Sequence, residues 1–204
     1  MESGYNEAIR LAKEKLAALD PDKVCKLCGA QFDGEKYTVK WMANEYEVED
    51  RPGYSKAHEI IFLHYLTSEG TKRPEGKLIS YRQIPAAAFY EPKFIQRAVM
   101  PLVRCFGADP GGLARTGESL GGAESSEVGG SEFAHSVKID LLPRLPVTYI
   151  LWEDYENQGE ASGNILFDRT APGWLCAEDL AVAASLGAYE LIGEYKKRVK
   201  NKII

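Results

Sequence analysis

The chain has 204 residues, of which 45% are hydrophobic and 27% charged, and its formal net charge is −5. These proportions are those of an ordinary globular protein and exclude a chain that is disordered throughout. The acidic balance argues against nucleic acid as a partner, because proteins that bind it usually carry a basic patch.

The sequence also argues against a membrane protein. Its apolar runs, such as residues 60–63, are far shorter than the roughly 18 apolar residues of a membrane span. The first residues, MESGYNEAIR, lack the basic start and apolar segment of a secretory signal. We therefore expect a cytoplasmic protein whose four cysteines are reduced thiols.

The first quarter of the chain predicts one helix and one hairpin. Apolar residues recur at helical spacing over residues 6–19, and Asp20-Pro21 ends this helix, because a residue before proline avoids the helical region. Residues 37–42 and 46–48 alternate as two strands joined by a turn.

The middle of the chain predicts two more helices. Residues 55–66 are apolar on nearly every side, which indicates a central buried helix with Ser55 as its N-cap. A short strand is expected at residues 78–82. A helix over residues 92–106 should be kinked or restarted at Pro101, which lacks a backbone donor.

The last part of the chain begins with a glycine-rich loop, residues 107–131, with one short helix near Leu113. It has neither a Walker phosphate loop nor a dinucleotide-binding glycine pattern. Three strands and a final helix should follow, the second strand apolar on both faces and therefore interior. We expect these elements at residues 137–142, 147–152, 164–167 and 174–200.

These elements predict an α+β fold with a small mixed or mostly antiparallel sheet, flanked by four or five helices. The connections are too irregular for repeated βαβ units. We expect a single domain over residues 1–204, in which residues 1–50 form the N-terminal helix and hairpin.

Cys25 and Cys28 have the spacing of half a zinc knuckle. Structural zinc normally needs four ligands, and the other two cysteines are distant in sequence. A two-cysteine redox site and simple buried thiols are the alternatives.

Acidic residues follow two of the late strands. Glu153 and Asp154 come directly after the interior strand, and Asp168 ends the next one. Carboxylates at strand ends can bind a cation or act as acid and base. The alternative is a solvated strand exit.

Several segments between residues 55 and 185 resemble an uncharacterised prokaryotic family, a domain of unknown function found mainly in anaerobic bacteria and archaea. Some relatives carry an iron–sulfur domain similar to those of corrinoid proteins. The segments that carry the resemblance are HEIIFLHYL from residue 58, GKLISYRQIP from 76, FIQRAVMPL from 94, LPRLPVTYILWE from 142, ILFD from 165 and EDLA from 178.

Because no catalytic constellation stands out in the sequence, we expect a cofactor- or partner-binding accessory factor that catalyses no reaction itself, and the resemblance implies a link to corrinoid or iron–sulfur metabolism. His64, Arg82, Arg97 and Trp152 are the polar and aromatic residues that recur in the resemblance. We expect them to bind a small molecule, such as a corrinoid or another tetrapyrrole, or a protein, with the first three drawn around one cavity. The alternatives are a small enzyme with an acidic site and a structural subunit of a complex.

Overall fold

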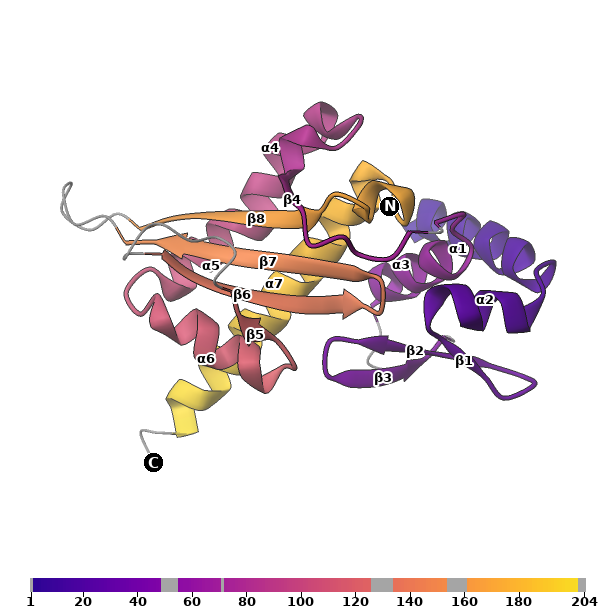
Figure 1. Cartoon of the computed structure of the whole chain (residues 1–204), viewed down its shortest axis with the longest axis horizontal. Coiled ribbons are helices and arrows are strands. Elements are labelled where there is room, and N and C mark those ends of the chain that lie inside the picture. Colours follow the sequence, from indigo (N-terminus) through magenta and orange to yellow (C-terminus); the bar gives the residue numbers. More distant parts are fainter. Residues whose placement is uncertain (1, 49–54, 71, 126–133, 154–160, 202–204) are drawn as a thin grey trace.

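The computed structural model describes residues 2–48, 55–70, 72–125, 134–153 and 161–201 (Figure 1). Within these ranges, every strand pairing is antiparallel. A five-stranded sheet has the order β4-β8-β7-β6-β5, and a three-stranded sheet has the order β1-β2-β3. The strands are β1 Gln31–Phe32, β2 Tyr37–Trp41, β3 Asn44–Glu47, β4 Leu78–Ser80, β5 Ala123–Glu124, β6 Ala134–Leu142, β7 Leu145–Trp152 and β8 Ser162–Asp168.

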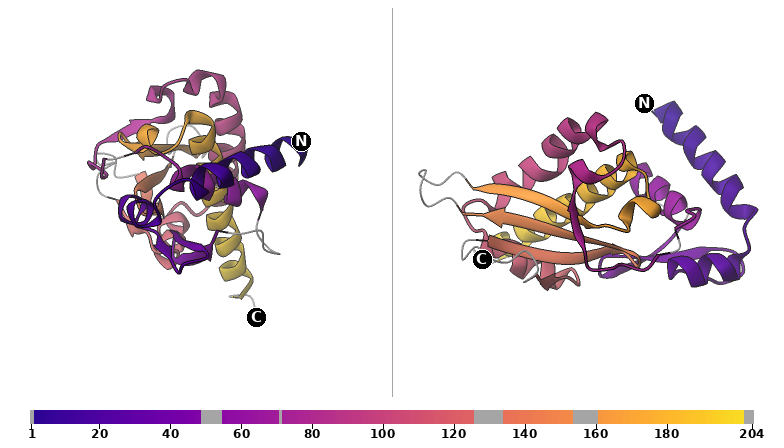
Figure 2. Two further views of the ribbon diagram at one scale, coloured as in Figure 1. Left: turned by 90° about the vertical axis from the view of Figure 1, so that its right-hand side faces the viewer. Right: turned by 45° about the horizontal axis from the view of Figure 1, so that its top comes forward.

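Helices cover one face of the five-stranded sheet (Figures 1 and 2). The predicted α+β class is therefore confirmed, with antiparallel sheets. The helical elements are α1 Glu2–Ala17, α2 Pro21–Cys28, α3 Lys56–Leu66, α4 Glu91–Phe94, a π-helical turn Ile95–Val99, α5 Met100–Phe106, α6 Gly111–Ser119 and α7 Ala177–Asn201, with short 3-10 helices at Tyr81–Gln83, Ala87–Phe89 and Ala171–Gly173. None of the helices in the described ranges has both the length and the hydrophobicity of a membrane span.

Helix α2 is one of the elements that the sequence patterns did not predict, as are the short strands β1 and β5. Asp20 and Pro21 end α1, as expected, but they also begin α2. The side chain of Asp20 accepts a hydrogen bond from the backbone N–H of Asp22 at 3.1 Å, and proline is favoured in the first helical turn. The same two residues therefore end α1 and begin α2, and Cys25 and Cys28 consequently lie on a helix.

The expected buried helix and interior strand are both confirmed. All residues of α3 from Glu59 to Leu66 are buried except His64. In β7, every residue from Leu145 to Leu151 is buried, because β6 and β8 flank it. A single continuous hydrophobic cluster joins the two sheets and the helices.

The long helix α7 crosses the middle of the sheet and contacts β7 closely. The Tyr149 hydroxyl donates to the carbonyl of Ala184 at 3.2 Å. A Cβ added at Gly187 would lie 2.2 Å from the Tyr149 oxygen. Gly187 therefore allows α7 to lie closer to β7 than any side chain at this position would permit. The helix continues unbroken through Gly187.

We predict that Gly187→Ala destabilises the protein by about 1–3 kcal/mol, because the new methyl group overlaps Tyr149 and Leu141. Gly193→Ala, on the same helix with no atom within 4 Å of the added Cβ, is the matched control. It should stabilise the protein by up to about 1 kcal/mol through helix propensity. Urea unfolding followed by circular dichroism measures both changes, and equal effects of the two substitutions would contradict the close contact.

Candidate functional site

In the described part of the sheet, the edge of β8 is only partly covered by β4. β4 pairs with β8 opposite Leu166, Phe167 and Asp168 alone. On the other side, β7 pairs with β8 as far as Ser162. Among the strands that the structure describes, residues 162–165 of β8 therefore have a neighbour on one side only, and we call this stretch the open edge.

β4 ends at Ser80 because the chain turns away into a 3-10 helix. The backbone N–H of Ser80 donates to the side-chain oxygen of Gln83 at 2.8 Å. The next residue, Tyr81, is buried, and its ring stacks on Phe94 with the centroids 4.1 Å apart. Its hydroxyl donates to the carbonyl of Ala177 at 2.8 Å. These contacts hold Tyr81 against the helices and off the line that β4 would follow.

The backbone groups of the open edge differ in their partners. Arg169 donates its N–H to the carbonyl of Lys77 at 2.8 Å on the β4 side. Ile165 and Gly163 lie four and six residues before Arg169 in the strand direction. Because backbone groups alternate between the two sides of a strand, theirs also face the β4 side. The N–H of Ile165 donates to the side-chain oxygen of Asn164 at 2.8 Å. Among the described residues, Gly163 has no such partner on this side.

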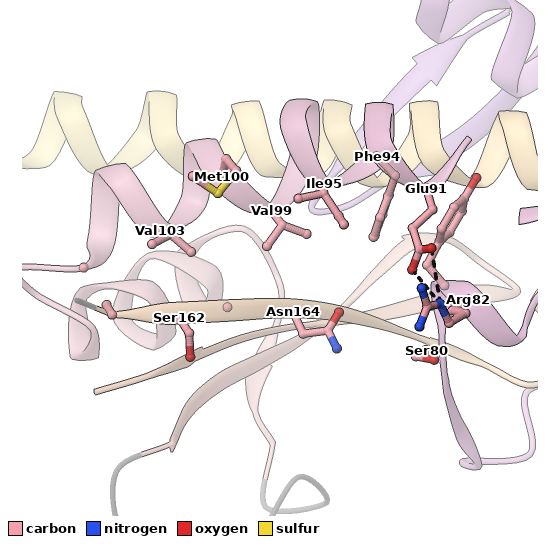
Figure 3. A pocket seen from close by; sticks show the side chains of 14 residues that line it. Ser80, Arg82, Glu91, Phe94, Ile95, Val99, Met100, Val103, Ser162 and Asn164 are labelled. Carbon is pink, nitrogen blue, oxygen red and sulfur yellow. Dashed lines mark hydrogen bonds and ion pairs between the residues drawn. The ribbon is translucent and has the colours of Figure 1, made fainter. Parts of the chain in front are cut away.

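An apolar helix lies opposite the open edge. The side chains of Phe94, Ile95, Val99 and Val103 point from the helix toward β8 (Figure 3). Val103 packs against Gly163, and an open hollow of about 800 Å³, which we call the groove, lies between this wall and the strand. Ile95 is 43% exposed and Met100 38%, so part of this apolar wall faces solvent. The groove is lined by Ser80, Tyr81, Arg82, Glu91, Phe94, Ile95, Val99, Met100, Val103, Gly107, Ala161, Ser162, Gly163 and Asn164.

The wall of the groove contains a π-helical turn, Ile95–Val99, just before Pro101. In a regular α-helix Pro101 would offer no N–H to the carbonyl of Arg97, and its ring would clash there. The N–H of Met100 instead bonds to the carbonyl of Ile95, five residues back. The expected disturbance at Pro101 therefore takes the form of a widened turn, a geometry that occurs often at functional sites.

An ion pair lies at the end of the groove next to β4. Arg82 Nε is 3.2 Å from Glu91 Oε1, and the Arg82 side chain is 79% exposed. The two opposite charges leave this end of the groove without net charge. Ser162 and Asn164 supply neutral polar groups on the strand (Figure 3).

The residues predicted to bind a cofactor do not meet in one cavity. Arg82 lines the groove, whereas Arg97 lines a separate hollow beside α7, and both are exposed. His64 Nδ1 is 2.9 Å from Asp179 Oδ2, and Trp152 is half-buried at the end of β7. The expected shared cavity is wrong, because the long charged side chains extend into solvent. Ligand binding by each residue separately stays a prediction.

Cys25 and Cys28 lie about one turn apart on α2. The thiol of Cys28 is buried and donates to the carbonyl of Tyr65 at 3.6 Å. Burial raises the pKa of Cys28 to about 12, so the thiol stays protonated. Across the ranges that the structure describes, no three His, Cys, Asp or Glu side chains are grouped so that they could hold a metal ion.

The carboxylate of Asp168 anchors the loop that precedes β4. One oxygen accepts hydrogen bonds from the backbone of Glu75 at 3.0 Å and Gly76 at 2.7 Å. The other accepts from the N–H and the hydroxyl of Thr170. Burial acts to raise the pKa of Asp168, but these hydrogen bonds outweigh it and lower the pKa. Both oxygens therefore have partners within the fold.

Glu153 and Asp168 are at opposite ends of the sheet. Glu153 follows β7 where that strand pairs with Ser162, and its carboxylate is 2.7 Å from His135 Nε2. Asp168 ends β8 six residues further along. Because β7 and β8 are antiparallel, Glu153 and Asp168 do not meet in one acidic site. Asp154, the third acidic candidate, lies outside the described residues.

The residues that form the groove were not among the predicted site residues. Gly163 carries a signal of close packing, since glycine inside a strand often marks a close approach, and here the side chain of Val103 on α5 makes that approach. Ile95 and Met100 carry a weaker one, two apolar residues on the exposed side of an amphipathic helix.

The family model for a domain of unknown function, DUF3786, matches residues 20–190. Because this match spans most of the chain, the protein belongs to that family. The resemblance to an uncharacterised domain family is thereby confirmed, whereas the distribution among anaerobes and the fusion to iron–sulfur domains stay predictions. No curated protein and no solved structure gave a significant match.

We predict that the contact between His64 and Asp179 makes stability depend on pH. The hydrogen bond to Asp179 raises the pKa of His64, although burial opposes the shift. The charged imidazole therefore stabilises the fold fully below the unfolded pKa of about 6.5, and this contribution disappears as the pH rises through the folded value. The measurement is the urea unfolding free energy of the wild type and of Asp179→Asn between about pH 6 and about pH 9.

The difference between the two proteins should shrink as the pH rises. Cys176→Ser is the control, because the Cys176 thiol donates to the same Asp179 oxygen at 3.3 Å without touching His64, and it should keep the pH dependence. A difference that stays constant over this range would contradict the role of His64.

Proposed function

We propose that this protein is a binding module that takes an extended segment of a partner protein into the groove as an additional strand. The observation that carries the proposal is the open edge, where the backbone of Gly163 has no described partner and faces an apolar helix wall. Strand addition to an exposed sheet edge is a recurring mode of peptide recognition.

The guest segment would continue the line of β4. β4 pairs antiparallel with β8 and ends opposite Leu166, so the next positions along the edge are available to another chain. The N–H and C=O of Gly163 would bond to the guest backbone. The missing side chain of Gly163 makes room for Val103 on the helix side, because an added Cβ would lie 2.9 Å from its Cγ2, while the backbone of Gly163 faces the guest in the plane of the sheet.

The guest sequence should alternate between apolar and polar residues. Side chains of an added strand point to opposite faces in turn. Those on the helix side would meet Ile95, Val99 and Met100, which are apolar. Those on the other side would lie beside Ser162 and Asn164. Backbone bonds would supply affinity, and these two rows of contacts would supply specificity.

We also propose the setting in which this binding occurs. The family resemblance supports a cytoplasmic accessory factor of anaerobic organisms whose partner belongs to corrinoid or iron–sulfur metabolism. In this proposal the chain holds the partner and catalyses no reaction itself. A tetrapyrrole bound in the groove is the competing occupant.

The test is a selection of displayed random peptides of about ten residues on the intact protein, with affinities then measured by fluorescence polarisation. We expect selected peptides with alternating apolar and polar residues. N-methylation at the peptide positions that face β8 should weaken binding about tenfold or more, and at the intervening positions it should change binding little.

Two substitutions locate the binding surface. Ile95→Glu places a charge on the exposed apolar wall and should weaken the peptides about tenfold. Phe89→Glu is the control, since Phe89 is 84% exposed and lies outside the groove. Failure of the selection, indifference to N-methylation, equal effects of both substitutions, or displacement by a tetrapyrrole without peptide binding would each overturn the proposal.

A further inference from the structure

A second, smaller hollow lies on the same helix as the groove, between that helix, α7 and the start of α3. Its volume is about 260 Å³. Phe94 lines both hollows, so the two cavities are separated by one side chain. The second hollow is lined by Ala57, Tyr90, Lys93, Phe94, Arg97, Glu178, Ala181, Val182, Ser185, Leu186 and Tyr189.

Two cations line this hollow without an acidic partner. Lys93 and Arg97 lie four residues apart, at the end of α4 and within the π-helical turn. Neither forms an ion pair or hydrogen bond with any residue that the structure describes. Arg82, at the nearby groove, is by contrast paired with Glu91.

The carboxylate of Glu178 and the hydroxyls of Tyr90 and Ser185 have partners within the protein. A hydrogen bond between Tyr90 and the carboxylate of Glu178 raises the pKa of Tyr90. The hydroxyl of Ser185 donates to the carbonyl of Ala181 at 2.7 Å. The two cations are therefore the groups left to bind a charged ligand.

The remaining lining is apolar and small. Ala57, Ala181, Val182 and Leu186 form it together with the Phe94 ring. A volume of about 260 Å³ is just below the usual range of small-molecule sites, about 300–1,000 Å³. It suits an organic molecule much smaller than a tetrapyrrole.

We propose that this hollow binds a small carboxylate with a short apolar or aromatic body. The carboxylate would bond to Arg97 and Lys93, and guanidinium binds carboxylates through paired hydrogen bonds. The apolar body would lie against Ala181, Val182 and Phe94. This site is distinct from the groove and does not depend on peptide binding there.

The test uses phenylacetate and hexanoate as probes, with phenylacetamide as the neutral analogue and inorganic phosphate as an anion without an apolar body. Calorimetry and thermal shift on the wild-type protein should show binding of the two carboxylates, and the melting temperature should rise with concentration. The amide and phosphate should bind about tenfold more weakly or not at all.

Three variants assign the contacts. Arg97→Gln should weaken phenylacetate about tenfold, and Ala181→Leu should block the hollow. Arg104→Gln is the control, because Arg104 is exposed on α5 and does not line the hollow. Absence of carboxylate binding, equal binding of amide or phosphate, or equal loss with Arg97→Gln and Arg104→Gln would overturn the proposal.

Discussion

The arrangement of this protein depends on one constraint, the early end of β4. A longer β4 would pair along all of β8 and cover the open edge. Instead the stacking of Tyr81 on Phe94 and the hydrogen bond from Tyr81 to Ala177 draw the chain toward the helices after Ser80. Exposed edges invite unwanted pairing, and proteins usually block them. Here side-chain oxygens accept hydrogen bonds from the N–H groups of Ser80 and Ile165, whereas Gly163 has no partner on this side among the residues that the structure describes.

The helix opposite this edge is shaped by Pro101. The missing donor of the proline is accommodated by a π-helical turn, which widens the helix where it separates the groove from the smaller hollow. Phe94 contacts both spaces and also stacks on Tyr81. One short segment therefore determines where β4 ends, what forms the apolar wall, and where Arg97 is placed.

The sequence predicted the parts of this fold that depend on periodicity. The apolar pattern of β7 and α3 identified the buried strand and the buried helix, because burial on all sides leaves no polar face. The apolar pattern did not predict α2, since Asp20-Pro21 ends one helix and begins another. It also did not predict the early end of β4, because that end depends on the stacking of Tyr81 on Phe94. The shared cavity around His64, Arg82 and Arg97 failed because apolar neighbours in sequence do not determine which way a long charged side chain points. The groove was not predicted, because the glycine and the apolar helix positions that form it do not reveal that β4 ends early.

The most direct measurement of the open edge is amide hydrogen exchange of β8, residue by residue, by NMR on the isotope-labelled protein. The N–H groups of Asn164 and Leu166 face β7 by the strand alternation and should exchange slowly, whereas the N–H of Gly163 should exchange quickly. A selected peptide in the groove should slow the exchange of Gly163 alone among these three. Slow exchange of Gly163 in the protein without peptide would contradict the open edge, and with it the proposed binding mode.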